Sequence, residues 1–429
     1  MNRYCVCTRL AVALAFMTTP AAAQQPLTLP DAQAEARAHA PETGELDAAV
    51  RAAEALAAQA RRRFRQDPIV SAGYFNGALI GRDETAANID VTLPVDLSGS
   101  WKPRSASSEA DVRRSGFDRE NGLLALDEQV AIAFADVALQ QRRIAREERL
   151  ASLYAIASDA VHRQLDVGQA AQFDADSADL DLAGARVSLA QARGDLAQAR
   201  GRLARLLGRA SSEDIVVTDP SEPAPIPERP NLDALVERDP RVHAALAEIE
   251  AATFERQTFE RLVTPMPTFG VASGYNRREI PAGSFRGVPF ANSLSTNWSD
   301  RDVVFNVSVP IPFFDRQLEP RARATGRLLT AEARARTVRA DVRAELESAW
   351  AGFDSAARAL QAVADTPSLI VRDAGFVEQA VRAGQFDTLT RALALRRLEE
   401  AGVRADTAVR DLRAARAAWI RRSRVFQQP

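Results

Sequence analysis

The residue types that usually carry catalysis or bind metals are scarce in this sequence. It has three histidines, which lie far apart: His39, His162 and His243. Cys5 and Cys7 are the only cysteines, and Met266 is the only methionine after residue 17. A zinc or soft-metal site needs several such ligands close together, and no nucleophile elbow, phosphate loop or zinc-protease signature occurs. We therefore predict a protein that is not an enzyme and has no cofactor and no metal site.

The remaining candidates for chemistry are carboxylates beside two glycines. Asp166 and Asp174 flank Gly168, and Asp387 follows Gly384. Each glycine interrupts a long helical pattern and predicts a turn between two helices. A carboxylate at such a turn can cap a helix or, when exposed, attract cations. The spacing alone leaves both roles open.

The first residues predict an exported protein. Arg3 precedes an apolar stretch from Leu10 to Met17, and small residues stand before Gln24. This pattern predicts a cleavable signal peptide over residues 1–23, whose removal would leave no thiol. After residue 23 the sequence has no run of about 18 apolar residues, which a membrane-spanning helix would need. The formal net charge is −2, which gives no reason to expect nucleic acid as a partner.

The two halves of the sequence resemble each other and predict two repeats joined by a proline-rich linker. Residues 219–230 contain five prolines, which fit neither a helix nor a central strand. Val91–Val95 matches Val307–Ile311, and since Pro94 aligns with Pro310 the offset is 310 − 94 = 216 residues. The same offset pairs Gly168 with Gly384. We therefore predict a first repeat at 24–218 and a second repeat at 231–429.

The sequence pattern of each repeat predicts the same order of elements: a helix, two strands, a long helix, a turn and a further helix. The long helices are predicted at Ser107–Val167 and Pro320–Ala383, each about 90 Å long, with the first helices of the repeats at Leu29–Arg65 and Arg241–Leu262. In the helix after Gly168, apolar residues spaced alternately three and four apart predict close helix packing: Leu182, Ala185, Leu189, Ala192, Leu196, Ala199, Leu203 and Leu206.

The predicted strands alternate apolar and polar residues, as strands do in a membrane barrel. The strands at 303–311 and 89–93 show this best, and their partners are predicted at 68–78 and 267–275. The side chains predicted to face lipid are Val91, Leu93, Phe305, Val307 and Val309. Four strands cannot close a barrel, and open edges are not tolerated in lipid. The expected fold is therefore mainly α with a small β part, in which long helices form a cylinder and other copies of the chain complete a transmembrane β-barrel. Three copies would supply twelve strands.

These features resemble a known family. The signal peptide, the two repeats, the VSVPIPFFDR stretch at 307–316 and the AGQFD turn at 383–387 are similar to the TolC-like outer-membrane efflux proteins. The stretches at 310–316 and 381–387 are most similar to the CzcC/CusC-like branch, which serves heavy-metal efflux. The family usually continues Asp-Arg with Asn-Gln-Gly, whereas Gln317–Pro320 follows here.

The resemblance implies a homotrimer in the outer membrane, in contact with its lipid. Four strands from each copy would form a trimeric, twelve-stranded transmembrane β-barrel, and the helices would form an α-barrel that is its long periplasmic extension. The implied partners are a periplasmic adaptor and an inner-membrane transporter of the resistance-nodulation-division class. The turns at Gly168 and Gly384 would then form the periplasmic tip, where three copies of Asp166, Asp174 or Asp387 could form an acidic ring. The acidic positions of the family correspond to Thr390 and Leu393 in this chain, which are not acidic. We therefore expect Asp387 and Asp166 to form the ring in their place.

Three functions remain open from the sequence. The first is the outer-membrane channel of a tripartite efflux system, with heavy-metal cations as the expected substrates. The second is a duct of the same fold for drug efflux or type I protein secretion. The third is a periplasmic coiled-coil scaffold that never enters lipid.

Overall fold

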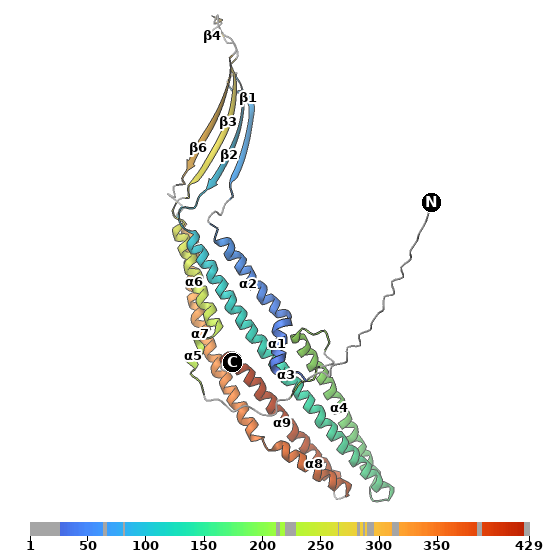
Figure 1. Cartoon of the computed structure of the whole chain (residues 1–429). Coiled ribbons are helices and arrows are strands. Elements are labelled where there is room, and N and C mark those ends of the chain that lie inside the picture. The colour runs from blue at the N-terminus through green and yellow to red at the C-terminus, as the bar shows by residue number, and fades with distance from the viewer. Residues whose placement is uncertain are drawn as a thin grey trace, which may run out of the picture. The chain divides into compact units, whose positions relative to one another are not determined.

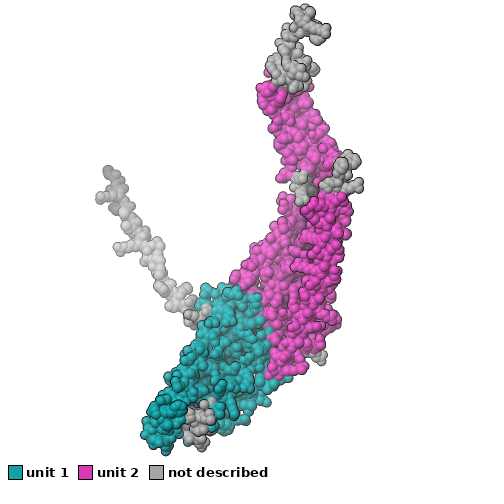
Figure 2. Space-filling model, turned by 180° about the vertical axis from the view of Figure 1, so that it is seen from behind, with its two compact units in different colours: residues 1–39, 129–225, 360–414 teal, residues 40–128, 226–359, 415–429 magenta. Residues whose placement is uncertain are grey.

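The computed structural model describes residues 26–62, 67–79, 82–211, 215–218, 229–264, 266–280, 284–285, 288–289, 296–310, 317–383 and 388–423. The chain divides into two compact units (Figure 2). Unit 1 comprises Met1–His39, Gln129–Pro225 and Leu360–Ala414, and unit 2 comprises Ala40–Glu128, Ile226–Ala359 and Ala415–Pro429. None of the described helices combines the length and apolar character needed to span a bilayer.

Helices make up most of the described chain (Figure 1). Unit 1 contains α1 (Leu29–His39), the second part of α3 (Trp101–Asp166), α4 (Gln172–Leu207), α8 (Thr366–Arg382) and most of α9 (Thr388–Ser423). Unit 2 contains α2 (Pro41–Ala60), the first part of α3, α5 (Leu232–Val236), α6 (Pro240–Arg261), most of α7 (Leu318–Ala362) and the end of α9. Helix α3 is a single helix of 66 residues, or about 100 Å at 1.5 Å per residue.

The predicted packing line of α4 is confirmed. Ala185, Ala192, Leu196, Ala199 and Leu203 are all buried, because the alternating three- and four-residue spacing keeps them on one side of the helix. In unit 1 a core also joins the α3 residues Leu153 and Ala157 to Val377 of α8 and to Leu395 and Leu398 of α9. In α9 of the second repeat, the corresponding packing line is formed by Leu398, Ala405, Leu412 and Trp419, which are also buried.

Two helices predicted as continuous are interrupted, and both interruptions occur at prolines. The prediction of one helix over Pro320–Ala383 is wrong: α7 ends at Ala362 and α8 begins at Thr366. The helix predicted at Leu29–Arg65 is likewise divided into α1 and α2, with Pro41 in the first turn of α2. Proline lacks the N–H of a helix interior but is tolerated in a first turn. Pro367 occupies that place in α8, so the new helix begins just before it.

The sheet of unit 2 has four antiparallel strands in the order β1-β2-β3-β6. They are β1 (Ile69–Leu79), β2 (Arg82–Pro94), β3 (Thr268–Ile280) and β6 (Thr296–Ser308). The two-residue strands β4 (Ser284–Phe285) and β5 (Val288–Pro289) pair with each other in the longer connection between β3 and β6. The predicted mainly α fold with a four-stranded sheet is thus confirmed. Strands β2, β3 and β6 are longer than the sequence pattern indicated.

Val309, one of the five residues predicted to lie on strands and face lipid, lies outside the strand that the structure shows. Strand β6 ends at Ser308, which pairs with Thr268 at the start of β3. Val309 therefore lies just beyond the paired strand. It precedes Pro310, whose nitrogen cannot donate a hydrogen bond and so cannot extend the ladder.

Candidate functional site

One face of the sheet is apolar near the helices of unit 2. In the cross-strand register, Val70, Val91, Val271 and Phe305 form one row, and Leu93, Phe269 and Val307 form the row next to it. Phe305 is 79% exposed and Val307 is 62% exposed in the single chain. Apolar residues in adjacent rows form a continuous patch, and large exposed patches usually mark a surface that contacts another molecule or lipid. The predicted strand residues Val91, Leu93, Phe305 and Val307 all lie on this face.

The apolar face becomes polar farther along the strands. Beyond a row with Ile89 and Val303 comes a row with Tyr74 and Tyr275, in which the guanidinium carbon of Arg301 lies 6.0 Å from the Tyr275 ring centre. In the next row the hydroxyl of Thr85 donates to Asn76 Oδ1 at 3.5 Å. Tyrosines between an apolar band and a polar region are typical of a membrane–water boundary.

The opposite face of the sheet is mainly polar, although Ile69, Phe75 and Val304 also lie on it. It carries Asn88, Asp90 and Thr92 of β2 and Asp302 and Asn306 of β6. Because successive residues of a strand point to opposite faces, these side chains alternate with the apolar ones. The sheet therefore has one mainly apolar face and one mainly polar face.

Both edges of this sheet are unpaired in the described part of the chain. Strand β1 pairs only with β2, and β6 pairs only with β3. These edge strands have 11 and 13 residues. Long, regular edges present rows of free N–H and C=O groups that favour pairing with another strand.

The turn at Gly168 is a helix C-terminus of the kind the sequence predicts. Gly168 has a φ of 75°, a left-handed conformation that glycine adopts without a steric cost. The amide of Gln169 donates to the Gln164 carbonyl at 2.7 Å and closes the end of α3. Gly384 and Asp387, the predicted counterparts in the second repeat, lie outside the described residues.

The two aspartates beside Gly168 lie in different surroundings. Asp174 is in the first turn of α4, where its Oδ2 accepts a hydrogen bond from the Ala171 amide at 3.3 Å. This is the helix-capping role that the sequence left open. Asp166 is the last residue of α3 and is exposed, so its carboxylate is the better candidate for contact with ions.

A polar contact near this turn was not predicted from the sequence. Asp179 of α4 accepts hydrogen bonds from the Ser158 hydroxyl at 2.7 Å and from His162 Nε2 at 3.1 Å, both on α3. The hydrogen bond from Ser158 and the contact with His162 lower the pKa of Asp179. The contact joins α3 to α4, which explains His162 without a metal. Among the described residues, no group of three or more His, Cys, Asp or Glu side chains could hold a metal ion.

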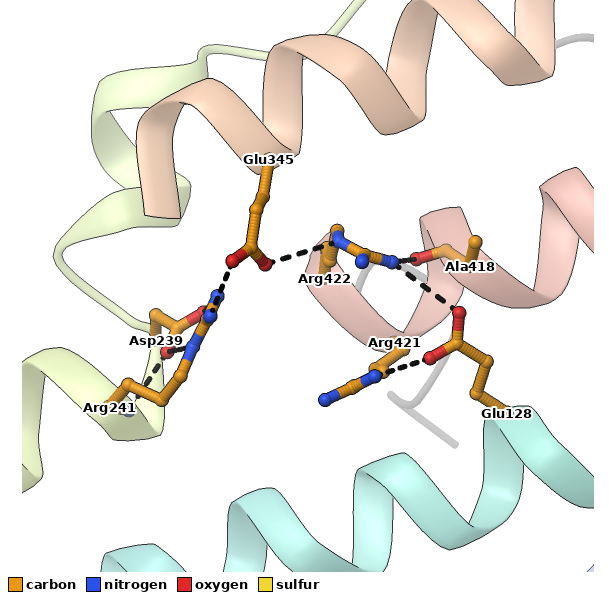
Figure 3. Close-up of polar contacts among 7 residues, drawn as sticks. All are labelled: Glu128, Asp239, Arg241, Glu345, Ala418, Arg421 and Arg422. Carbon is orange, nitrogen blue, oxygen red and sulfur yellow. Dashed lines mark hydrogen bonds and ion pairs between the residues drawn. The ribbon is translucent and has the colours of Figure 1, made fainter. Parts of the chain in front are cut away.

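A second polar network joins four helices of unit 2 (Figure 3). Glu345 of α7 accepts a hydrogen bond from Arg241 Nη1 at 3.0 Å and lies 3.4 Å from Arg422 Nε of α9. Glu128 of α3 accepts from Arg421 Nη1 at 2.5 Å. Asp239, which caps α6, accepts from the Arg241 amide at 2.8 Å. The sequence could not reveal this network because its members are up to 294 residues apart.

A second line of apolar residues lies on the exposed side of α4. Phe173, Leu180 and Val187 are spaced seven residues apart and are 79%, 74% and 56% exposed. Gly194 and Gly201 continue the same spacing, and a Cβ atom on either glycine would meet nothing within 4 Å. We call these five residues the outer stripe. A heptad line of apolar and small residues that is not covered by its own chain is typical of a helix that packs against another chain.

Comparisons with known proteins give one matching family model and several solved structures of similar fold. A family model described as outer membrane efflux protein matches residues 33–209. A search of the curated proteins finds no match to the chain. A solved membrane protein from Pseudomonas aeruginosa has a TM-score of 0.74 and 17% identity, over 92% of this chain and 93% of that chain.

Two further solved structures are named channels. The outer-membrane channel OprN has a TM-score of 0.71 and 21% identity, over 92% of this chain and 89% of its own. CusC, described in terms of transmembrane channel formation, has a TM-score of 0.69 and 16% identity, over 93% and 94%. The chain thus has the fold of the outer-membrane channels, and residues 33–209 carry the sequence pattern of outer membrane efflux proteins. OprN and CusC are described as channels, in line with the prediction that this chain is not an enzyme. Both resemble the chain to nearly the same degree, so the comparison does not favour one branch.

Proposed function

We propose that this protein is the outer-membrane channel of a tripartite efflux system. Three copies each contribute four strands to a twelve-stranded barrel in the outer membrane and their helices to a periplasmic tunnel. The channel is passive and receives its substrate from an inner-membrane pump of the resistance-nodulation-division class through a periplasmic adaptor. A signal peptide at residues 1–23 directs its export.

The observation that carries this proposal is a sheet with one apolar exposed face and two unpaired edges. Exposed backbone edges are too costly in lipid, so a four-stranded sheet needs partners to enter it. Pairing β1 of one copy with β6 of the next satisfies both edges at once. The strands have 11 to 13 residues, enough for a tilted strand to cross the apolar layer.

The helical part supports the same assembly. The outer stripe of α4 leaves Phe173, Leu180 and Val187 exposed in a single chain. Packing against a helix of a neighbouring copy covers these side chains, and the glycines of the stripe allow the helices to approach closely. The scaffold alternative explains this stripe but not the apolar face of the sheet.

Heavy-metal cations are the proposed substrates. The resemblance of residues 310–316 and 381–387 to the CzcC/CusC-like branch supports this choice, and CusC is among the structures with the same fold. We propose that Asp166 and Asp387 form acidic rings at the narrow periplasmic end, which attract cations. A drug or a secreted protein would be the substrate if these rings are absent from the pore.

The test is to extract the protein from outer membranes in detergent and to measure its oligomeric state and its conductance in planar bilayers. The proposal predicts a trimer that forms stable channels. A protein that fractionates with the soluble periplasm as a monomer would support the scaffold and would refute the channel.

A further inference from the structure

The polar face of the sheet contains glycines across which side chains of the neighbouring strand lie. Gly73, Asn88, Gly274 and Asp302 form one row across the four strands. A Cβ atom on Gly73 would lie 3.4 Å from Asn88 Cγ, and one on Gly274 would lie 3.4 Å from Asp302 Cγ. The Oδ1 atom of each polar side chain would be closer still. Any larger residue at either glycine would therefore displace the side chain beside it.

A third pair repeats the arrangement two rows nearer the helices. A Cβ atom on Gly270 would lie 2.8 Å from Asn306 Cγ and 3.0 Å from Thr92 Cγ2. All three polar side chains lean in the same sense across the sheet. Asn88 leans from β2 toward β1, while Asp302 and Asn306 lean from β6 toward β3.

These glycines need a specific explanation because glycine weakens a strand. Its usual reasons within a strand are a bulge or the close approach of another group. The register is continuous through Gly73 and Gly274, so neither lies at a bulge. The group that approaches is the neighbouring polar side chain itself.

This inference rests on the proposed channel. We propose that Gly73 and Gly274 are positioning residues that keep Asn88 and Asp302 flat against the inner wall of the barrel. The row then lines the duct without projecting into it. When β1 of one copy follows β6 of the next, the same row of alternating glycine and polar residues occurs three times around the barrel. It is displaced between copies by the register stagger that closes a barrel of tilted strands. The three aspartates and three asparagines of these rows therefore leave the lumen open along this band of the wall.

The first test is a double-substitution cycle on the thermal stability of the detergent-solubilised oligomer. Gly274→Ala should lower the midpoint of thermal dissociation because its methyl group displaces Asp302. Adding Asp302→Ser should restore much of the loss, whereas Gly326→Ala, at a helix position with nothing within 4 Å, should not lower the midpoint. Additive effects of the two substitutions would overturn the proposal, because Gly274 would then serve the backbone rather than Asp302.

The second test measures the open width of the duct. Ser71 lies on the same face as Gly73, one row nearer the helices, so a reagent entering from outside passes the Gly73 row first. The Ser71→Cys variant is treated on whole cells with thiol-reactive polyethylene glycols of increasing mass. Adding Gly73→Ala and Gly274→Ala should abolish labelling by the largest polymer that reaches the thiol in the parent variant. Adding Asn88→Ser and Asp302→Ser as well should restore it.

The outcomes separate this inference from the proposed function. A Ser71→Cys parent that forms no oligomer, or that no polymer labels from outside, refutes the channel and the inference together. A labelled parent whose mass limit is unchanged by the two alanines refutes the inference alone. A lower mass limit that the two serines restore supports it, because a purely structural role of the glycines would not alter the accessible width.

Discussion

Arg146 of α3 lies across Gly402 of α9 and forms an ion pair with Asp406, although the paired residues are 260 positions apart. A Cβ atom on Gly402 would lie 2.5 Å from Arg146 Cδ. The side chains of Arg146 and Asp406 are only 13% and 19% exposed. Gly402 thus provides the space in which the arginine crosses α9 to reach its partner.

We predict that Gly402→Ala destabilises the protein although alanine favours helices. The propensity gain is about 1 kcal/mol, while forcing a side chain into occupied space costs about 1–3 kcal/mol. The expected net loss is about 1 kcal/mol, measured as a lower thermal midpoint of the solubilised protein. Gly326→Ala is the matched control and should be neutral or stabilising, since its position is open. Equal behaviour of the two variants would contradict this account.

The outer stripe of α4 predicts a substitution that blocks assembly without unfolding the chain. Val187→Glu places a charge on a surface that the proposed trimer covers, where an unpaired charge is costly. We expect monomers in detergent with unchanged helix content by circular dichroism. Arg186→Glu, which introduces the same residue one position away and off the stripe, should still form trimers. Trimers in both variants would mean that α4 does not contact a second copy through this stripe.

The aspartates near the helix turns should separate into two functional groups. Asp166→Asn and Asp387→Asn should lower the cation selectivity of single channels, because each removes three charges from the proposed ring. Asp174→Asn should leave selectivity unchanged and lower stability by about 1 kcal/mol at most, as expected for a weakened helix cap. Unchanged selectivity in both ring variants would show that the acidic ring does not operate in this channel.

The network around Glu345 predicts a loss of stability in acid. Partial burial acts to raise the pKa of Glu345, but the guanidinium groups of Arg241 and Arg422 outweigh it and hold the pKa below 4.5. A carboxylate whose pKa is lower in the folded state than in the unfolded chain stabilises the fold fully above about pH 4.5. This contribution is lost as the pH falls through the pKa of the folded state. Thermal midpoints measured from pH 7 to pH 3 should show this decline. In Glu345→Gln the same decline should be smaller; an identical pH profile would exclude Glu345 as a source.

The elements predicted best from the sequence are those with strong periodicity. The line from Leu182 to Leu206 has a heptad spacing that identifies the buried side of α4 directly. Strand β6 also alternates clearly. Strand β2 extends to Arg82, beyond the prediction, because Ala86 and Ala87 give no apolar alternation and only pairing with β1 and β3 defines them as strand.

The contacts between distant segments could not be predicted in the same way. Arg241, Glu345 and Arg422 have ordinary helical surroundings in sequence, and their meeting depends on how α6, α7 and α9 pack. The glycines beneath Asn88 and Asp302 likewise have no local signature, because the approaching side chain comes from another strand. The interruption before Pro367 is different: the proline was visible, but its place in a first turn rather than in a helix interior depends on the turn at 363–366.

The interruption between α7 and α8 limits the symmetry of the proposed assembly. Two similar repeats in each of three copies would approximate a sixfold arrangement of long helices. Helix α3, however, is continuous over 66 residues, whereas its counterpart is divided into α7 and α8. In the proposed trimer, three continuous helices would therefore alternate with three interrupted ones around the wall. Bending would concentrate at the three interruptions, so an opening motion that preserves the trimer would have threefold rather than sixfold character.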